Sequence, residues 1–288
     1  MELTPEQVEA ILKAATSGNP AARYWPYLMG LVLDGILQGI LFCQAATWFR
    51  KSYPKERWIL RTLAIWTLVV CLAFTCLQTA RCLQIFAFDF GKYSGFLANA
   101  MAQWLIVMLF MVNIPVQGFF THRAYVLANR SIVLLIALVI MIAAVTALAI
   151  TCVAMFPAMH QVIVWPKVEL DLFTAVSSMS AGLDVAITGC ILIQLWRRRV
   201  GTGPSSRFIR RLMILSVESQ FPPCIFAIVI CVMDATGNIG STPVMVALLT
   251  KSSAMNLFTV LNARRTLRSE LNPTTIDLEV SFPLRVGS

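Results

Sequence analysis

Seven long apolar runs dominate this chain of 288 residues and limit what it can fold into. An apolar segment of about 20 residues is long enough to cross the hydrocarbon core of a bilayer as a helix. Only 13% of the residues are charged, whereas a soluble domain usually has about a quarter. The predicted spans are 24–49, 62–86, 95–120, 131–156, 171–196, 212–233 and 243–263. We therefore expect an all-α integral membrane protein, in which one domain (24–263) forms a seven-transmembrane-helix bundle in the lipid bilayer.

The basic residues are distributed unevenly between these runs, and this predicts the orientation of the bundle. If the connections alternate between two sides, 17 of the 23 Lys and Arg residues fall on one side and four on the other, while Arg81 and Lys251 lie within spans. Short basic loops remain in the cytoplasm. The N-terminus is thus predicted outside and the C-terminus in the cytoplasm, with anionic lipid head groups bound at the cytoplasmic basic loops. The net charge of +9 is a topology signal, so no nucleic acid is expected as a partner.

Shorter segments flank the bundle. Residues 1–23 are predicted to be extracellular and to contain a short amphipathic helix, with Thr4 as its cap. Residues 264–288 are predicted to form a cytoplasmic tail, basic at first and then disordered. Trp25, Trp48 and Trp196 lie at the ends of runs, where they are expected to form aromatic belts at the membrane interfaces.

Polar residues inside the runs are the candidates for a functional site. A charged residue at mid-membrane depth costs about 2.5–3.5 kcal/mol and is usually paired. The candidates are Asp34, Asp184, Glu218, Lys251 and Asn262, the last of which shares a helical face with Lys251. Asp34, Asp184 and Lys251 lie near the middle of their spans. We expect Lys251 to pair with Asp34, because the first and last helices of a closed ring are neighbours, or with Asp184 across the cavity.

Prolines inside the runs are hinge candidates. Pro115 lies in the third run, and Pro222 and Pro223 lie in the sixth. A proline in a helix removes the hydrogen bond to the carbonyl four residues earlier. Because the carbonyls of Glu218 and Ser219 would lose their donors, the sixth helix is predicted to kink beside a buried carboxylate.

Five stretches carry a combined resemblance. The first run contains MGLVLDGILQGILFCQ, the third ends in VQGFFTHRAY and the fifth contains AGLDVAITGCILIQLWRRRVG; FIRRLMILSVES opens the sixth, and KSSAMNLFTVLNARRTLR lies in the seventh. Together they resemble a family of fungal, chiefly basidiomycete, seven-helix membrane proteins of unknown function. Asp34 stands where that family usually has Asn. The second run lacks the family's Asp-Thr and His positions, and the seventh lacks the Tyr and the first Asn after the lysine. The resemblance implies a seven-helix fold and a site that this chain has lost or remodelled.

A receptor-like or sensor-like protein of the plasma membrane is the favoured function. An external N-terminus, a kinked sixth helix and a basic third inner loop (197–211) suit helix movement that a small-molecule ligand drives and a cytoplasmic transducer reads. The topology is that of G-protein-coupled receptors, but their Asp/Glu-Arg-Tyr and Asn-Pro-x-x-Tyr motifs do not occur in the sequence.

Two alternatives use the same polar residues. Asp34, Asp184, Glu218 and Lys251 would suit a small-solute or proton transporter, although no internal repeat is visible. A lysine midway along a seventh helix also suits a microbial-opsin-like retinal protein, in which the amine forms a Schiff base. The third run has no carboxylate to serve as the counter-ion, which disfavours retinal.

No enzymatic activity, metal or other cofactor is expected. All eight cysteines fall within predicted spans and form no CxxC or other metal-ligand pattern. His122 and His160 are predicted in loops on opposite sides of the membrane, where they cannot share a site. No nucleophile motif occurs in the sequence.

Overall fold

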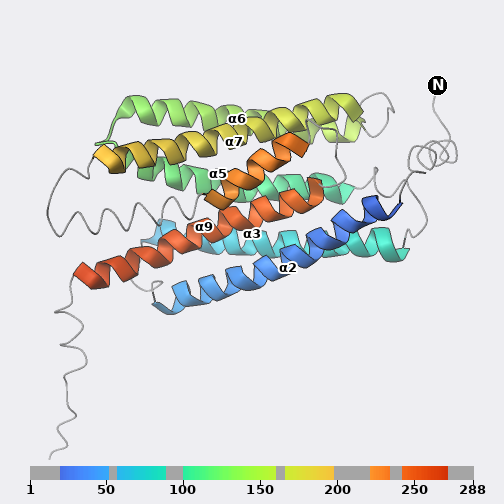
Figure 1. Cartoon of the computed structure of the whole chain (residues 1–288), viewed down its shortest axis with the longest axis horizontal. Helices are drawn as coiled ribbons and strands as arrows, with labels where there is room; N and C mark the ends of the chain where they lie inside the picture. The colour runs from blue at the N-terminus through green and yellow to red at the C-terminus, as the bar shows by residue number, and fades with distance from the viewer. Residues whose placement is uncertain are drawn as a thin grey trace, which may run out of the picture.

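The computed structural model of the chain describes residues 20–51, 57–88, 100–159, 166–197, 221–233 and 242–271, and no strand occurs among them. The long helices are α2 (Pro20–Lys51), α3 (Trp58–Leu83), α5 (Ala100–Leu127), α6 (Ile132–Met159), α7 (Pro166–Arg197) and α9 (Thr242–Leu271). A five-residue π-helix, η2 (Gln84–Phe88), continues α3. Figure 1 shows the long helices running along one axis, with the shorter helix Phe221–Met233 (orange) beside α9.

Six of the described helices are long and apolar enough to cross a membrane. They correspond to six of the seven predicted runs. The described part of the chain is therefore all-helical, and its six spans are those of a multi-pass membrane protein in contact with the bilayer. The helix Phe221–Met233 covers the second half of the predicted sixth span. Residues 212–220 lie outside the described residues, and with them the predicted position of Glu218 and the predicted kink.

Several helices extend beyond the predicted spans. Hydropathy limits a span to the hydrocarbon core, whereas a helix can continue through the polar head-group region. Accordingly α2 already begins at Pro20, and α9 continues to Leu271, eight residues past the predicted end of its span. The prediction that His122 lies in a loop is wrong, because α5 continues to Leu127. The predicted amphipathic helix before residue 20 and the tail beyond residue 271 lie outside the described residues.

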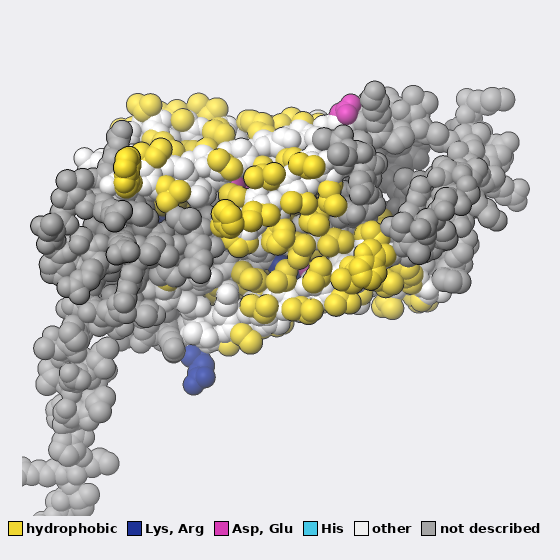
Figure 2. All heavy atoms as spheres, in the orientation of Figure 1, with side chains coloured by type: hydrophobic (Ala, Val, Ile, Leu, Met, Phe, Trp, Pro, Cys, Tyr) yellow, Lys and Arg dark blue, Asp and Glu magenta, His cyan; other side chains and the backbone are white. Residues whose placement is uncertain are grey.

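The outer surface of the bundle is apolar. In the apolar stretch of α6, only 17% of the residues are buried. In the corresponding stretch of α9, 78% of the residues are buried. Val133, Ile140 and Ile150 of α6 are among the strongly exposed side chains. Figure 2 shows hydrophobic side chains over most of the described face and very few charged ones. Such a large exposed apolar surface is stable in lipid rather than in water.

The inward face of α2 combines polar, small and large apolar residues, while many of its other apolar residues point outward. Its buried positions recur every three or four residues, the spacing of one helical face, and are Pro26, Gly30, Asp34, Gln38, Leu41, Ala45 and Trp48. Val32, Ile36 and Ile40 are exposed between them. This buried face packs against α9.

Gly30 allows α2 and α9 to approach closely. A Cβ atom at Gly30 would lie 3.3 Å from Cα of Val244 in α9. Small residues at helix crossings in membranes allow this kind of backbone contact. Farther along the same interface, the ring of Trp48 meets that of Phe258 edge to face, with centroids 6.1 Å apart.

The prediction that Trp48 belongs to an aromatic belt is wrong. Its side chain is fully buried, because it fills the space between α2 and α9. Trp25 and Trp196, in contrast, are 62% and 69% exposed, as residues at a membrane interface can be.

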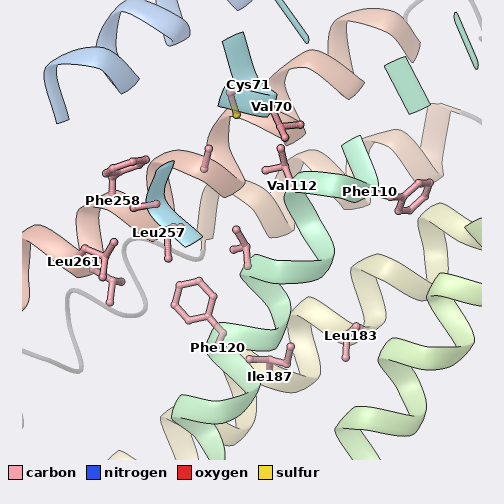
Figure 3. Close-up of a cluster of buried hydrophobic side chains, with 14 of the residues drawn as sticks. Val70, Cys71, Phe110, Val112, Phe120, Leu183, Ile187, Leu257, Phe258 and Leu261 are labelled. Atoms are coloured by element: carbon pink, nitrogen blue, oxygen red, sulfur yellow. The ribbon is translucent and has the colours of Figure 1, made fainter. Parts of the chain in front are cut away.

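A buried apolar cluster holds α9 in the centre of the bundle. Figure 3 shows part of this cluster, with side chains from neighbouring helices. They include Val70 and Cys71 of α3, Phe110, Val112 and Phe120 of α5, Leu183 and Ile187 of α7, and Leu257, Phe258 and Leu261 of α9. Because α9 contacts α2, α3 and α5, its polar residues can meet partners on several sides.

Pro115 lies inside α5, as predicted, and its effect on the backbone is compensated by α3. Proline has no N–H, so the carbonyl of Met111 loses its usual helical donor. The indole N–H of Trp66 in α3 donates a hydrogen bond to this carbonyl at 3.0 Å. Pro115 therefore creates a link between α3 and α5 at an otherwise apolar surface.

Candidate functional site

Lys251 lies a third of the way along α9, with its side chain fully enclosed. Its Nζ donates hydrogen bonds to Oε1 of Gln38 at 2.6 Å, the carbonyl oxygen of Cys71 at 2.6 Å and Oγ1 of Thr75 at 2.8 Å. An ammonium group has three N–H donors, so every one has an acceptor. Nζ also lies 3.4 Å from Oδ1 of Asp34. The structure thus contains the first of the two pairings expected for Lys251.

Thr75 connects the two charges of this pair. Its hydroxyl accepts a hydrogen bond from Lys251 and donates one to Oδ2 of Asp34 at 2.6 Å. Asp34 comes from α2, Thr75 from α3 and Lys251 from α9, so the ion pair and Thr75 together connect three helices. The ring of Phe74 adds a cation–π contact, with its centroid 5.4 Å from Nζ.

This arrangement explains why two charges can exist inside the bundle. A buried ion pair is tolerated only when good geometry and additional hydrogen bonds compensate for the loss of water. Gln38, Thr75 and the Cys71 carbonyl supply those hydrogen bonds. Gln38 follows Asp34 by four residues and therefore lies on the same face of α2. We call Asp34, Gln38, Cys71, Thr75 and Lys251 the lysine cluster.

Asp184 is not the partner of Lys251 in the structure, so the second expected pairing is not made. Its Oδ1 accepts a hydrogen bond from Nε2 of Gln117 in α5 at 2.9 Å. The same amide group lies 3.4 Å from Oγ of Ser180. No Lys or Arg among the described residues forms an ion pair with Asp184. The position of Asp184 on α7, beyond α5, separates it from the lysine cluster.

A small polar cavity lies beside Asp184. It has a volume of about 20 Å³ and is enclosed by α5, α7, α9 and the helix Phe221–Met233. The polar residues in its wall are Asn113, Gln117, Asp184, Thr188, Cys224, Ser253 and Asn256. We call this space the aspartate cavity. It is large enough for about one water molecule or a small ion.

The hinge candidates of the sixth span lie next to this cavity. Pro222 is exposed, and Pro223 is buried and forms part of the cavity wall. Both prolines lie in the first described turn of the helix Phe221–Met233. Any movement of this helix would therefore change the shape of the aspartate cavity.

Asn262 connects α9 to α2 nearer the basic end of the helix. Its Nδ2 donates to the carbonyl oxygen of Gln44 at 3.1 Å. The side chain of Gln44 in turn lies 3.4 Å from Oγ1 of Thr259. Asn262 and Lys251, which share a face of α9, both contact α2.

A larger and mostly apolar groove lies on the outside, between α3, α5 and α6. It has a volume of about 590 Å³ and includes Trp66, Pro115 and Gln103, whose amide group donates to the carbonyl oxygen of Val153 at 2.9 Å. Among the described candidate charges, none of Asp34, Asp184 and Lys251 contributes to its wall. In the described part of the chain, no group of three or more His, Cys, Asp or Glu side chains could hold a metal ion.

Several residues of the lysine cluster and of the aspartate cavity were not recognised as candidates in the sequence. Gln38, Thr75, Asn113 and Gln117 are uncharged, and hydroxyl and amide side chains are common in membrane helices as packing residues. A usable signal existed for Gln38, one turn after Asp34. Gln117 also lies in the VQGFF stretch quoted above, but its partner on α7 could not be identified without the packing of α5 against α7.

Comparison with known proteins covers only the C-terminal part of the chain. A family of unknown function (DUF6534) matches residues 180–266. This region contains Asp184, the aspartate-cavity residues of the helix Phe221–Met233, Lys251 and Asn262, whereas Asp34 lies outside it. No curated protein and no solved structure matches the chain. Over less than a third of its length, the chain is thus similar to an uncharacterised family.

Proposed function

We propose that this chain is a receptor-like protein of the plasma membrane, with seven transmembrane helices, an external N-terminus and a cytoplasmic C-terminus. The span that brings the six described spans to seven is the sixth apolar run, 212–233, whose second half is the helix Phe221–Met233. The uneven distribution of Lys and Arg supports the orientation. The stretches quoted above are similar to fungal proteins with seven helices, which agrees with this count.

The observation that carries the receptor-like function is the position of α9 between two polar clusters. Lys251 ties α9 to α2 and α3, while Ser253 and Asn256 of the same helix contribute to the aspartate cavity. A helix held by a charge pair on one side and by a hydratable cavity on the other has the parts of a two-state switch. A small-molecule ligand would shift its equilibrium, and the basic cytoplasmic segments would present the change to a transducer.

A small-solute or proton transporter is the second candidate. The aspartate cavity supports it, since a carboxylate without an ion-pair partner among the described residues can exchange a proton or a bound solute. The retinal alternative has less support. The Lys251 amine makes three hydrogen bonds, its side chain is fully buried, and it contributes to neither of the two cavities described above.

The orientation and the number of spans can be tested together. Epitope tags are added to both termini, and antibody binding is measured on intact cells and after permeabilisation. An odd number of spans places the tags on opposite sides, so only the N-terminal tag should bind antibody on intact cells. Tags on the same side would refute the seven-helix proposal.

Receptor-like and transporter-like functions are separated by two measurements on purified protein. In proteoliposomes with a pH-sensitive dye inside, a receptor-like protein should give no proton flux above that of empty liposomes. Flux that Asp184→Asn removes would establish the transporter instead.

The switch itself is tested by alkylation of Cys224 in detergent. Lys251→Met should make α9 easier to displace and so speed this alkylation. Ser252→Ala, which changes the buried residue next to Lys251, should leave the rate unchanged. Equal rates in all three proteins would refute the switch.

A further inference from the structure

The wall of the aspartate cavity contains three amide oxygens that lack a hydrogen-bond donor among the described residues. Oδ1 of Asn113, Oε1 of Gln117 and Oδ1 of Asn256 are buried and have no hydrogen-bond partner in the described protein. All three residues contribute to the cavity wall, together with the Asp184 carboxylate. Their side chains are only 4–5% exposed. A buried acceptor without a donor is costly, particularly in a protein surrounded by lipid.

The charge in this cavity is also uncompensated within the described residues. Gln117 donates one hydrogen bond to Asp184, but an amide supplies no net positive charge. No Lys or Arg of the described ranges belongs to the cavity wall. Lys251 is on the same helix as Ser253, but its three N–H groups are used in the lysine cluster. A carboxylate in a membrane interior is normally paired with a positive charge.

A small monovalent cation would satisfy both the oxygens and the charge. Carboxylate and amide oxygens are the ligands that hard cations prefer. One positive charge neutralises one carboxylate, whereas a divalent ion would leave a net charge in the low-dielectric interior. The volume of about 20 Å³ admits one ion of the size of Na⁺. A water molecule could donate to two of the oxygens but would leave the charge uncompensated.

We propose that the aspartate cavity is a binding site for a Na⁺-sized monovalent cation, with the Asp184 carboxylate as the charged ligand and the side-chain oxygens of Asn113, Gln117 and Asn256 as neutral ligands. The ion would join α5, α7 and α9 at one point. It would also stabilise the position of the helix Phe221–Met233, because Pro223 and Cys224 belong to the same cavity wall. This inference does not rest on the receptor-like function.

The site can be tested by thermal unfolding of the full chain, purified in detergent. The melting temperature is measured in increasing NaCl, with choline chloride keeping the ionic strength constant. A ligand that binds only the folded state raises the melting temperature with its concentration. We expect a saturable rise with Na⁺ that Asp184→Asn abolishes. Asp34→Asn is the matched control, since it removes the carboxylate of the lysine cluster and should leave the Na⁺-dependent rise intact.

A second measurement uses the wild-type chain and does not depend on the folding of any variant. Cys224 belongs to the cavity wall, whereas Cys43 is exposed on the outside of α2. If an ion closes the cavity, Na⁺ at ten times its dissociation constant should slow alkylation of Cys224 about tenfold and leave Cys43 unchanged. Equal behaviour in Na⁺ and choline, or an equal Na⁺ effect in Asp184→Asn, would overturn the proposal and leave water as the occupant.

Discussion

The Nζ atom of Lys251 and the Oδ1 atom of Asp34 lie 3.4 Å apart, and neither side chain is exposed. The two residues are separated by most of the chain, and α2 and α9 meet along a face that includes both. Thr75 of α3 completes the contact by accepting from the ammonium group and donating to the carboxylate. The pair therefore fixes the relative positions of three helices.

The charges of this pair should stabilise the bundle only together. Lys251→Met leaves the Asp34 carboxylate buried without its cation, and Asp34→Leu leaves the ammonium group alone, so each should cost about 3–5 kcal/mol. The double variant Asp34→Leu with Lys251→Met should cost much less than the sum of the two. Thermal unfolding in detergent provides the comparison. Additive losses would mean that the two charges do not interact.

Thr75 should matter more than a neighbouring threonine of the same helix. Thr75→Val removes a hydroxyl that binds both charged groups, and the expected loss is about 1.5–3 kcal/mol. The control is Thr79→Val, because the Thr79 hydroxyl only donates to the backbone carbonyl oxygen of Thr75. The two variants are compared by their unfolding midpoints. A loss in Thr79→Val as large as in Thr75→Val would contradict the bridging role.

Gly30 should not tolerate a large side chain, although Gly39 on the same helix should. Gly30→Leu would push α2 away from Val244, and overpacking of this kind typically costs about 1–3 kcal/mol. At Gly39 an added Cβ meets nothing within 4 Å, and Leu has a better helix propensity than Gly. Gly39→Leu should therefore be neutral or slightly stabilising. Similar unfolding midpoints for both variants would count against close packing of α2 on α9.

Trp66 and Pro115 should be energetically coupled. Trp66→Phe removes the donor to the Met111 carbonyl and should cost about 0.5–1.5 kcal/mol in the wild-type chain. In a Pro115→Ala background, the new backbone N–H can bond to that carbonyl, so the same Trp66 substitution should cost much less. A double-mutant cycle of unfolding free energies measures the difference. An equal cost in both backgrounds would show that the indole hydrogen bond does not depend on the proline.

The protein should not form a retinal pigment. Schiff-base formation would require Lys251 to give up its hydrogen bonds to Gln38, Cys71 and Thr75, and its side chain has no exposed surface. We expect expression with all-trans-retinal to give no visible absorption band after purification. A band that disappears in Lys251→Ala would establish the opsin-like alternative.

Depth in the membrane was predictable from the sequence, but lateral position was not. Counting residues along the apolar runs placed Lys251, Asp34 and Asp184 near mid-depth, which made two pairings for the lysine plausible. The structure contains the pairing with Asp34, and Asp184 faces Gln117 instead. The difference depends on which helices are neighbours and on how each is rotated about its axis, and residue counts contain neither.

The sequence by itself determined the class of this protein. Long apolar runs with few charges have only one stable arrangement in lipid, in which every backbone group is satisfied inside a helix. Six of the seven runs are helices of sufficient length and apolar character to span the membrane. The burial of Trp48, the Thr75 bridge and the acceptors around Asp184 were decided only by the tertiary structure. Because runs that are apolar on nearly every face do not indicate which side is inward, only packing against neighbouring helices brings these groups together.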